Sequence, residues 1–160
     1  MGRAGSRGAA VLAAVAVAVW VLDRATKLWA ERTLPGAPIE LVPGALTLRY
    51  TTNSGGAFGI GRSAPWLFVG ASLVVVVAIV LTAFRPRSAP SAAGLGLILG
   101  GALGNLTDRA VRAPGFAGEV VDFIDLHVWP VFNLADASIV VGALVLVVTS
   151  AAQDRRRDGA

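Results

Sequence analysis

The sequence predicts an all-α integral membrane protein with four transmembrane helices and a small β-sheet in the first outer (periplasmic-side) connection. Of its 160 residues, 55% are hydrophobic and only 15% are charged, which is unusual for a soluble domain. A spanning helix needs about 20 mostly apolar residues, and four stretches qualify: 9–28, 65–84, 91–110 and 131–150. No repeat or low-complexity linker divides the chain, so we treat 1–160 as a single membrane-embedded domain.

The first apolar stretch has some features of a secretory signal, since Arg3 and Arg7 precede a core rich in Ala and Val. However, the apolar run is long, and Lys27 lies three residues before Ala30, where a cleavage site would need a small residue. We therefore interpret this stretch as a retained helix.

Basic residues predict the orientation of the helices. Lys and Arg concentrate in the N-terminal tail, in the 85–90 loop and at the C-terminus, whereas the connections 30–64 and 111–130 are poorer in them for their length. Loops rich in Lys and Arg stay on the cytoplasmic side. Both termini are therefore predicted to be cytoplasmic.

The two outer connections differ in character. Apolar and polar residues alternate within 46–52, after the turn-forming Pro43-Gly44. This pattern predicts a small sheet within about 37–62. The connection 111–130 contains Pro114-Gly115 and then Gly118, and we expect it to be a flexible loop that could cover a site between the helix ends.

Composition excludes several classes of function. The chain has no Cys and one His, so thiolate and histidine-rich metal sites are excluded, and we expect neither a metal nor a cofactor. The net charge is +4, but the basic residues lie in short clusters between apolar runs. We interpret them as orientation signals and expect no nucleic-acid partner.

Ionisable and amide side chains gather near the outer ends of three predicted helices, although a charge in hydrocarbon costs at least about 2.5 kcal/mol. The residues are Asp23 and Lys27 on the first helix, Asn105, Asp108 and Arg109 on the third, and Asn133 and Asp136 on the fourth. The inner halves of the helices are almost purely apolar. Polar groups therefore converge on one layer.

Local patterns leave the roles of these groups open. Asp23 with Lys27, and Asp108 with Arg109, fit both ion pairs that hold the bundle together and parts of a functional site. Asp136 has no basic neighbour on its own helix, which favours a functional carboxylate.

Two further acids lie in the short apolar stretch 120–125. Asp122 fits both a solvated loop acid and a carboxylate held at the interface, and Asp125 is expected to be solvated. The local sequence does not show which of these two acids has a functional role.

Glycines form two groups. Those on the third helix have the small-residue spacing that allows close helix packing: Gly94, Gly96, Gly100, Gly101 and Gly104. Gly55, Gly56 and Gly59 follow Asn53 in the outer connection, where a tight turn and close approach to a ligand are equally good explanations.

Five segments, in this order along the chain, resemble the motifs of the lipoprotein signal peptidases, also called signal peptidase II. They are Asp23 with Lys27, Asn53-Ser54-Gly55-Gly56-Ala57-Phe58, residues 100–109, Val121-Asp122-Phe123, and Phe132-Asn133-Leu134-Ala135-Asp136. The resemblance covers nearly the whole chain. The chain departs from the family pattern at 110–120, which is longer than the family often has, and this leaves the shape of the 111–130 loop open.

The resemblance implies an aspartic endopeptidase of the bacterial cell (inner) membrane, with its active site near the outer face. Asp122 and Asp136 would form a catalytic dyad that activates water. The substrate would be a prolipoprotein, cut before its diacylglyceryl-modified cysteine, and membrane lipid would surround the enzyme. The residues implied to bind substrate or to support the dyad are Asn53, Gly55, Asn105, Asp108, Arg109, Asn133, Asp23 and Lys27.

Three alternatives predict different features. A small transporter or proton-relay protein would spread ionisable groups through the bilayer depth. A structural subunit that binds partner helices would not depend on Asp122. A metalloprotease would need paired histidines or a His-Glu arrangement on a helix, and the chain has a single histidine.

Overall fold

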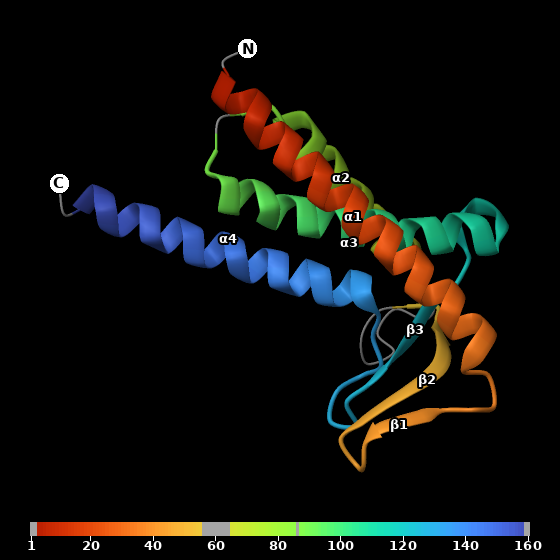
Figure 1. Ribbon diagram of the computed structural model, residues 1–160. Helices are drawn as coiled ribbons and strands as arrows, with labels where there is room; N and C mark the ends of the chain where they lie inside the picture. The colour runs from red at the N-terminus through yellow and green to blue at the C-terminus, as the bar shows by residue number, and fades with distance from the viewer. Residues whose placement is uncertain (1–2, 56–64, 86, 159–160) are drawn as a thin grey trace.

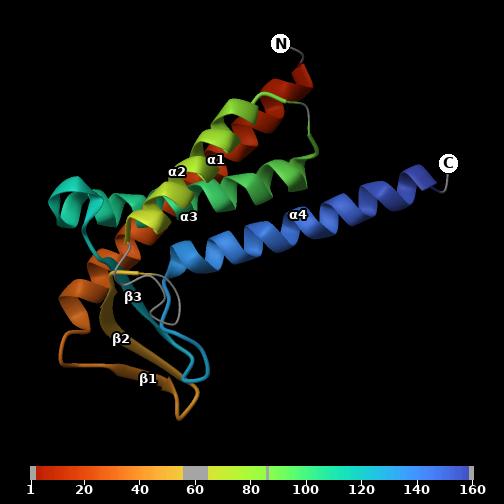
Figure 2. The ribbon, with the colours of Figure 1, turned by 180° about the vertical axis from the view of Figure 1, so that it is seen from behind.

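The computed structural model describes residues 3–55, 65–85 and 87–158. Helices and strands within these ranges follow in the order α1 (Arg3–Thr33), β1 (Ile39–Val42), β2 (Leu46–Asn53), α2 (Pro65–Thr82), α3 (Ala89–Arg112), the 3-10 helix η2 (Pro114–Phe116), β3 (Val120–Asp125) and α4 (Leu134–Asp158). Figure 1 shows the sheet at one end of the helices, with both chain termini toward the opposite end. The reverse view in Figure 2 shows the same arrangement.

Within the described residues, three helical segments are long and apolar enough to cross a membrane: Gly5–Thr33, Ala89–Arg112 and Leu134–Gln153. The apolar part of α2, Trp66–Thr82, is shorter, so the count of four spans stays a prediction. α4 begins at Leu134 and not at 131, because Pro130 precedes it and the side chain of Asn133 accepts a hydrogen bond from the N–H of Asp136, as an N-cap does.

Helix α3 lies at the centre of the bundle and packs against α1, α2 and α4. Its glycines make the close approach possible. A Cβ atom at Gly100 would lie 2.6 Å from the carbonyl oxygen of Ala16 on α1, and one at Gly101 would lie 2.5 Å from that of Ala135 on α4. No side chain fits at such distances, which confirms the packing role predicted for these glycines.

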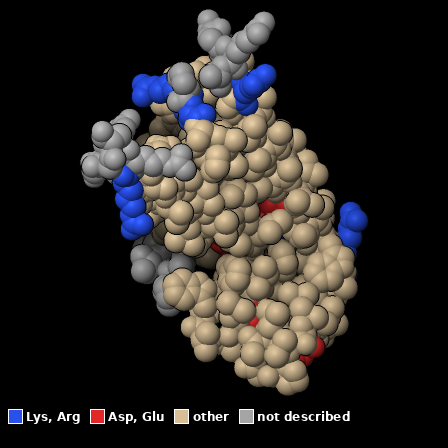
Figure 3. All heavy atoms as spheres, turned by 60° about the vertical axis from the view of Figure 1, so that its left-hand side comes forward, with Lys and Arg blue, Asp and Glu red and all other residues tan. Residues whose placement is uncertain are grey.

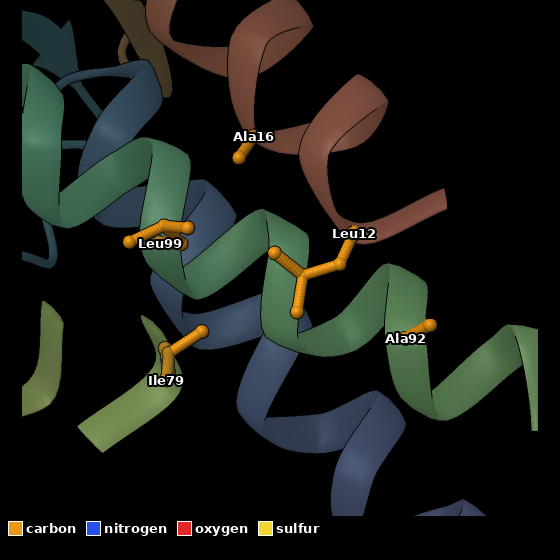
Figure 4. Close-up of a cluster of buried hydrophobic side chains, with 5 residues drawn as sticks. All are labelled: Leu12, Ala16, Ile79, Ala92 and Leu99. Atoms are coloured by element: carbon orange, nitrogen blue, oxygen red, sulfur yellow. The ribbon is translucent and has the colours of Figure 1, made fainter. Parts of the chain in front are cut away.

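The apolar core between the helices is small. Figure 4 shows its side chains from three helices, with Leu12 and Ala16 of α1, Ile79 of α2, and Ala92 and Leu99 of α3. Many large apolar side chains lie instead on the surface of the bundle, including those of Leu81, which is 77% exposed, and Val147, which is 66% exposed. Figure 3 shows most of the visible basic side chains at one end, beside a broad surface without charge. A bundle that faces lipid has such a surface.

The sheet has the order β1-β2-β3, and both pairs are antiparallel. β1 and β2 lie within 37–62, where a small sheet was predicted, and residues 56–62 of that range lie outside the described residues. The third strand was not predicted. It comes from the connection 111–130, where β3 pairs Asp122 with Thr51 and Val120 with Asn53.

The expectation of a flexible loop over 111–130 is therefore wrong for 120–125, and η2 also gives 114–116 regular structure. The physical reason is burial. All four residues from Val120 to Phe123 are buried, so the segment lacks the alternation of apolar and polar residues that marks a strand exposed on one face.

Candidate active site

Asp122 and Asp136 line the same cavity, although they come from different elements. Asp122 lies on β3 and is only 2% exposed, so it is not a solvated loop acid. Asp136 lies in the first turn of α4 and is half-buried. The sheet thus brings one carboxylate to the helix end that carries the other.

The cavity has a volume of about 350 Å³, with a polar end and apolar walls. Its polar lining contains Asn53, Asn105, Asp122 and Asp136, together with Arg109. The apolar lining comes from α2, α4 and the segment before α4, with Phe68, Trp129, Pro130, Val131, Phe132, Ile139 and Val140.

Two asparagine side chains donate hydrogen bonds to Asp122. The Nδ2 atom of Asn133 lies 2.7 Å from Asp122 Oδ1, and that of Asn53 lies 3.2 Å from Asp122 Oδ2. Both amides have a fixed orientation, because each Oδ1 accepts from a backbone N–H, that of Asp136 for Asn133 and that of Gly55 for Asn53. Since a backbone N–H can only donate, each NH₂ group must face Asp122.

Asp136 also accepts two hydrogen bonds. Its Oδ1 lies 2.8 Å from the Nδ2 atom of Asn105, and its Oδ2 lies 3.3 Å from the backbone nitrogen of Asn133. Asn133 and Asp136 thereby cap each other at the start of α4, in the reciprocal pattern of a capping box. This cap fixes the Asp136 carboxylate at the end of the helix.

The environment of Asp122 favours its protonated form. Burial and the negative charge of Asp136 together raise the pKa of Asp122 from 3.8 to about 7, although the hydrogen bonds from Asn133 and Asn53 act in the opposite direction. The carboxyl group of Asp122 therefore changes its charge near neutral pH.

Asp125, three residues along the same strand, has the opposite environment. Its Oδ2 accepts from the Nε atom of Arg49 at 2.5 Å, and its Oδ1 accepts from the backbone N–H of His127. These hydrogen bonds, the one from Arg49 above all, lower the pKa of Asp125. The structure separates Asp122 from Asp125, which the sequence left undecided.

A buried ion cluster lies behind Asn105. Asp23, Lys27 and Asp108 are all completely buried, and Lys27 Nζ lies 2.8 Å from Asp23 Oδ2 and 3.0 Å from Asp108 Oδ2. Asp108 also pairs with Arg24 and Arg112. Asp23 accepts in addition from the backbone N–H of Ala135 at 3.0 Å, which ties α1 to the start of α4.

Asp108 and Arg109, for which an ion pair was one of two open explanations, do not pair with each other. Adjacent residues on a helix point in different directions, and Arg109 instead donates to backbone carbonyl oxygens of Ser54, Gly55 and Gly118 at 2.9 to 3.4 Å. Arg109 therefore holds the end of β2 and the start of the β3 segment against α3.

The structure brings together every predicted site residue that it describes. Asn53, Gly55, Asn105 and Arg109 line the cavity with the two aspartates, Asn133 bonds to both of them, and Asp23, Lys27 and Asp108 form the cluster behind. The predicted motif residues Gly56, Ala57 and Phe58, and Gly59 beside them, lie outside the described residues.

Sequence reasoning missed the apolar walls of the cavity, such as Phe68 and Ile139. No local signal distinguishes these side chains from ordinary lipid-facing ones. Among the residues that the structure describes, no group of three His, Cys, Asp or Glu side chains could hold a metal ion.

Comparison with known proteins gives a consistent result. The family model described as signal peptidase (SPase) II matches residues 15–152. The lipoprotein signal peptidase of Syntrophomonas wolfei is 43% identical over 142 residues, which cover 88% of this chain and 92% of that protein. That of Streptomyces coelicolor is 45% identical over 148 residues, which cover 91% and 72% of the two chains.

Two solved structures have the same fold, and both are described as bacterial membrane enzymes. One aligns with a TM-score of 0.75 and 29% identity over 88% of this chain and 87% of its own. The other aligns with a TM-score of 0.70 and 30% identity over 84% and 88%.

Proposed function

The chain belongs to the signal peptidase II family, and we propose that it cleaves prolipoproteins as an aspartic protease whose catalytic pair is Asp122 and Asp136. The family supports a multi-pass membrane protease that removes signal peptides from prolipoproteins. The aspartic mechanism rests on one observation: two carboxylates from different elements line one cavity, in which asparagine amides hold both.

The surroundings of the two carboxylates suggest which one carries the proton. Asp136 lies in the first turn of α4, where the helix dipole favours a negative charge. Asp122 is buried beside that charge, and its pKa of about 7 favours a proton there at neutral pH. We therefore assign Asp136 as the general base and Asp122 as the general acid.

The proposed reaction proceeds in two proton-balanced steps. Asp136 takes a proton from water as the water oxygen attacks the scissile carbonyl carbon, and Asp122 gives its proton to the carbonyl oxygen. In the second step the C–N bond breaks, Asp136 gives its proton to the leaving amine, and Asp122 recovers a proton from the hydroxyl of the intermediate. Both carboxyl groups return to their starting states.

The shape of the cavity fits a lipidated peptide. Its polar end holds the dyad together with Asn53 and Arg109, and its apolar walls extend along α2 and α4 through Phe68, Ile139 and Val140. Apolar walls with a few polar groups are typical of a ligand site. We propose that the acyl chains of a diacylglyceryl cysteine contact the apolar walls while the peptide before it reaches the dyad.

We further propose that the dyad lies near the outer membrane surface and that both termini are cytoplasmic. The basic residues of the N-terminal tail, the 85–90 loop and the C-terminus support this orientation. Figure 1 places the termini at the helix ends opposite the sheet, and the sheet carries Asp122.

Cleavage by the purified protein in detergent tests the proposal. The substrate is a diacylglyceryl-modified prolipoprotein, and the same chain without the lipid serves as a comparison. Wild type should cut the lipidated form before the modified cysteine. The cleavage rate should fall about 10²- to 10⁴-fold in Asp122→Asn and in Asp136→Asn, which is the usual contribution of a general acid or base. Asp125→Asn should keep the wild-type rate. Full activity in folded Asp136→Asn would overturn the dyad.

A further inference from the structure

Lys27 is completely buried, and its ammonium group lies among three oxygen atoms. Its Nζ atom is 2.8 Å from Asp23 Oδ2, 2.9 Å from Asn105 Oδ1 and 3.0 Å from Asp108 Oδ2. The ammonium donates a hydrogen bond to Asn105 Oδ1 and forms ion pairs with the carboxylates of Asp23 and Asp108; an ammonium group can donate but cannot accept.

Asn105 lies between Lys27 and the dyad. Its Oδ1 accepts from Lys27, and its Nδ2 donates to Asp136 Oδ1 at 2.8 Å. If the amide turned over, its N–H groups would face an ammonium that cannot accept, and its oxygen would face a carboxylate. The Nδ2 atom of Asn133 also donates to Asn105 Oδ1, at the longer distance of 3.3 Å. The ammonium of Lys27, which gives the shorter and charged hydrogen bond to that oxygen, therefore helps to set which end of the Asn105 amide faces Asp136.

We propose that Lys27 is a positioning residue for catalysis, which holds the Asn105 amide so that its N–H group faces Asp136. This inference rests on the proposed aspartic mechanism. The N–H group of Asn105 stabilises the negative charge that Asp136 needs to act as base. The charge of Lys27 also acts on Asp122 through space, so the positioning effect is the part of the change in Lys27→Met that disappears when Asn105 is replaced as well.

Other charged groups also act on the dyad and must stay unchanged in the test. Asp136 faces Asp122 on β3, and both carboxylates act on Arg109 of α3, as does Asp108. Asp23 of α1 reaches the same turn of α4 through Ala135. Arg24 pairs with Oδ1 of Asp108, the carboxylate that Lys27 contacts through Oδ2.

Arg24 supplies the matched control. Arg24→Gln removes an ion pair of Asp108 and leaves the hydrogen bond from Lys27 to Asn105 in place. Its cleavage rate should stay within about twofold of wild type, with an unchanged pH profile, because Asp108 keeps Lys27 and Arg112 as cationic partners.

The test is a double-mutant cycle with Lys27→Met, Asn105→Ala and the double variant, measured on the diacylglyceryl prolipoprotein. Each single variant should lower kcat about 10- to 100-fold, as loss of outer-shell partners does at metal sites. The double variant should be no slower than Asn105→Ala, since the two residues act in series. The acidic limb of the pH profile should move to higher pH in Lys27→Met, because its base is less well stabilised as an anion.

Losses that multiply in the double variant, together with an unmoved acidic limb, would overturn the positioning role. They would leave Lys27 as an ion-pair partner only. If wild type itself fails to cleave the substrate, or if Asp136→Asn cleaves it, the proposed function fails instead, so the two failures are distinguishable.

Removal of Lys27 alone leaves Asp23 buried without a cation, which strongly destabilises a protein. The variant Asp23→Asn/Lys27→Met removes both charges together, and the new amide oxygen can still accept from the N–H of Ala135. Compared with Asp23→Asn alone, it should show the same shift of the acidic limb. An identical pH profile in these two variants would also overturn the proposal.

Discussion

Asn133 donates a hydrogen bond from its side-chain amide to Oδ1 of Asp122 at 2.7 Å, and the same residue caps helix α4 at Asp136. One asparagine thus joins the strand that carries the first carboxylate to the helix that carries the second. The relative position of the two aspartates depends on this residue, and its two functions can be tested separately.

Asn133→Ser should keep the helix cap but lose the donor to Asp122, because serine is a good N-cap residue with a shorter side chain. We expect Tm to change little while kcat falls about 10- to 100-fold. Asn133→Ala should lose both functions, with a further loss of about 1 kcal/mol in the free energy of unfolding. Thermal unfolding in detergent beside the cleavage assay checks both, and a fully active Asn133→Ser protein would contradict the first expectation.

The pKa of Asp122 predicts the alkaline side of the pH profile. As the general acid, Asp122 must be protonated, and its pKa is raised to about 7. The value of kcat/KM should therefore decrease as pH rises through about 7, and a profile from pH 5 to 9 measures this limb.

Asp125→Asn is the control for that profile. Asp125 lies on the same strand, but its carboxylate accepts a hydrogen bond from Arg49, and Asp125 does not line the cavity. Its variant should keep the alkaline limb at the same pH. A limb that moves in Asp125→Asn, or a flat wild-type profile up to pH 9, would contradict the assignment of Asp122 as the acid.

Folding stability should also depend on Asp122. Its pKa is raised in the folded protein, from 3.8 to about 7, so its stabilising contribution is complete below pH 3.8 and is lost as pH rises through about 7. The slope reaches at most about 1.4 kcal/mol per pH unit for one proton.

Asp122→Asn cannot ionise at this position and should lack that decrease. The difference in Tm between Asp122→Asn and wild type should therefore grow in favour of the variant from pH 5 to pH 8. An equal pH dependence of Tm in both proteins would show that Asp122 does not change its charge in this range.

Gly104 tests the close contact between α3 and the ion cluster. A Cβ atom there would collide with Oδ2 of Asp23, the oxygen that pairs with Lys27. Gly104→Ala should destabilise the protein by about 1 to 3 kcal/mol, as overpacking does, and should reduce cleavage as well.

Gly70→Ala is the matched control for Gly104→Ala. Gly70 also lies within a helix, α2, but nothing lies within 4 Å of a Cβ atom placed there. Because alanine is a better helix former than glycine, Gly70→Ala should leave Tm unchanged or slightly raised. If Gly104→Ala behaved like Gly70→Ala, the contact with Asp23 would not matter for stability.

Several features were predictable from the chain because they depend on local patterns. Long apolar runs identified the helices, and the spacing of Asp23 with Lys27 on one helix face predicted their contact, which the structure confirms. The alternation at 46–52 predicted β2. These signals concern residues within one element, where periodicity alone fixes the neighbours.

Other features depended on segments far apart in the sequence. Val120–Phe123 are buried on both faces, so no alternation marked β3 as a strand. Nothing local indicated that Arg109 would bond to the backbone at Ser54, Gly55 and Gly118 rather than pair with Asp108.

The sequence by itself determined the membrane class, the helices and the layer in which polar side chains gather, because burial in lipid imposes apolar periodicity on every span. Its motifs also indicated Asp122 and Asp136 as the proposed dyad. Only the tertiary structure decided that Asp122 is buried beside the start of α4, and that the amides of Asn53, Asn105 and Asn133 face the two carboxylates. Such contacts join residues from different elements, and their geometry exists only once β3 pairs with β2 and the helices pack around α3.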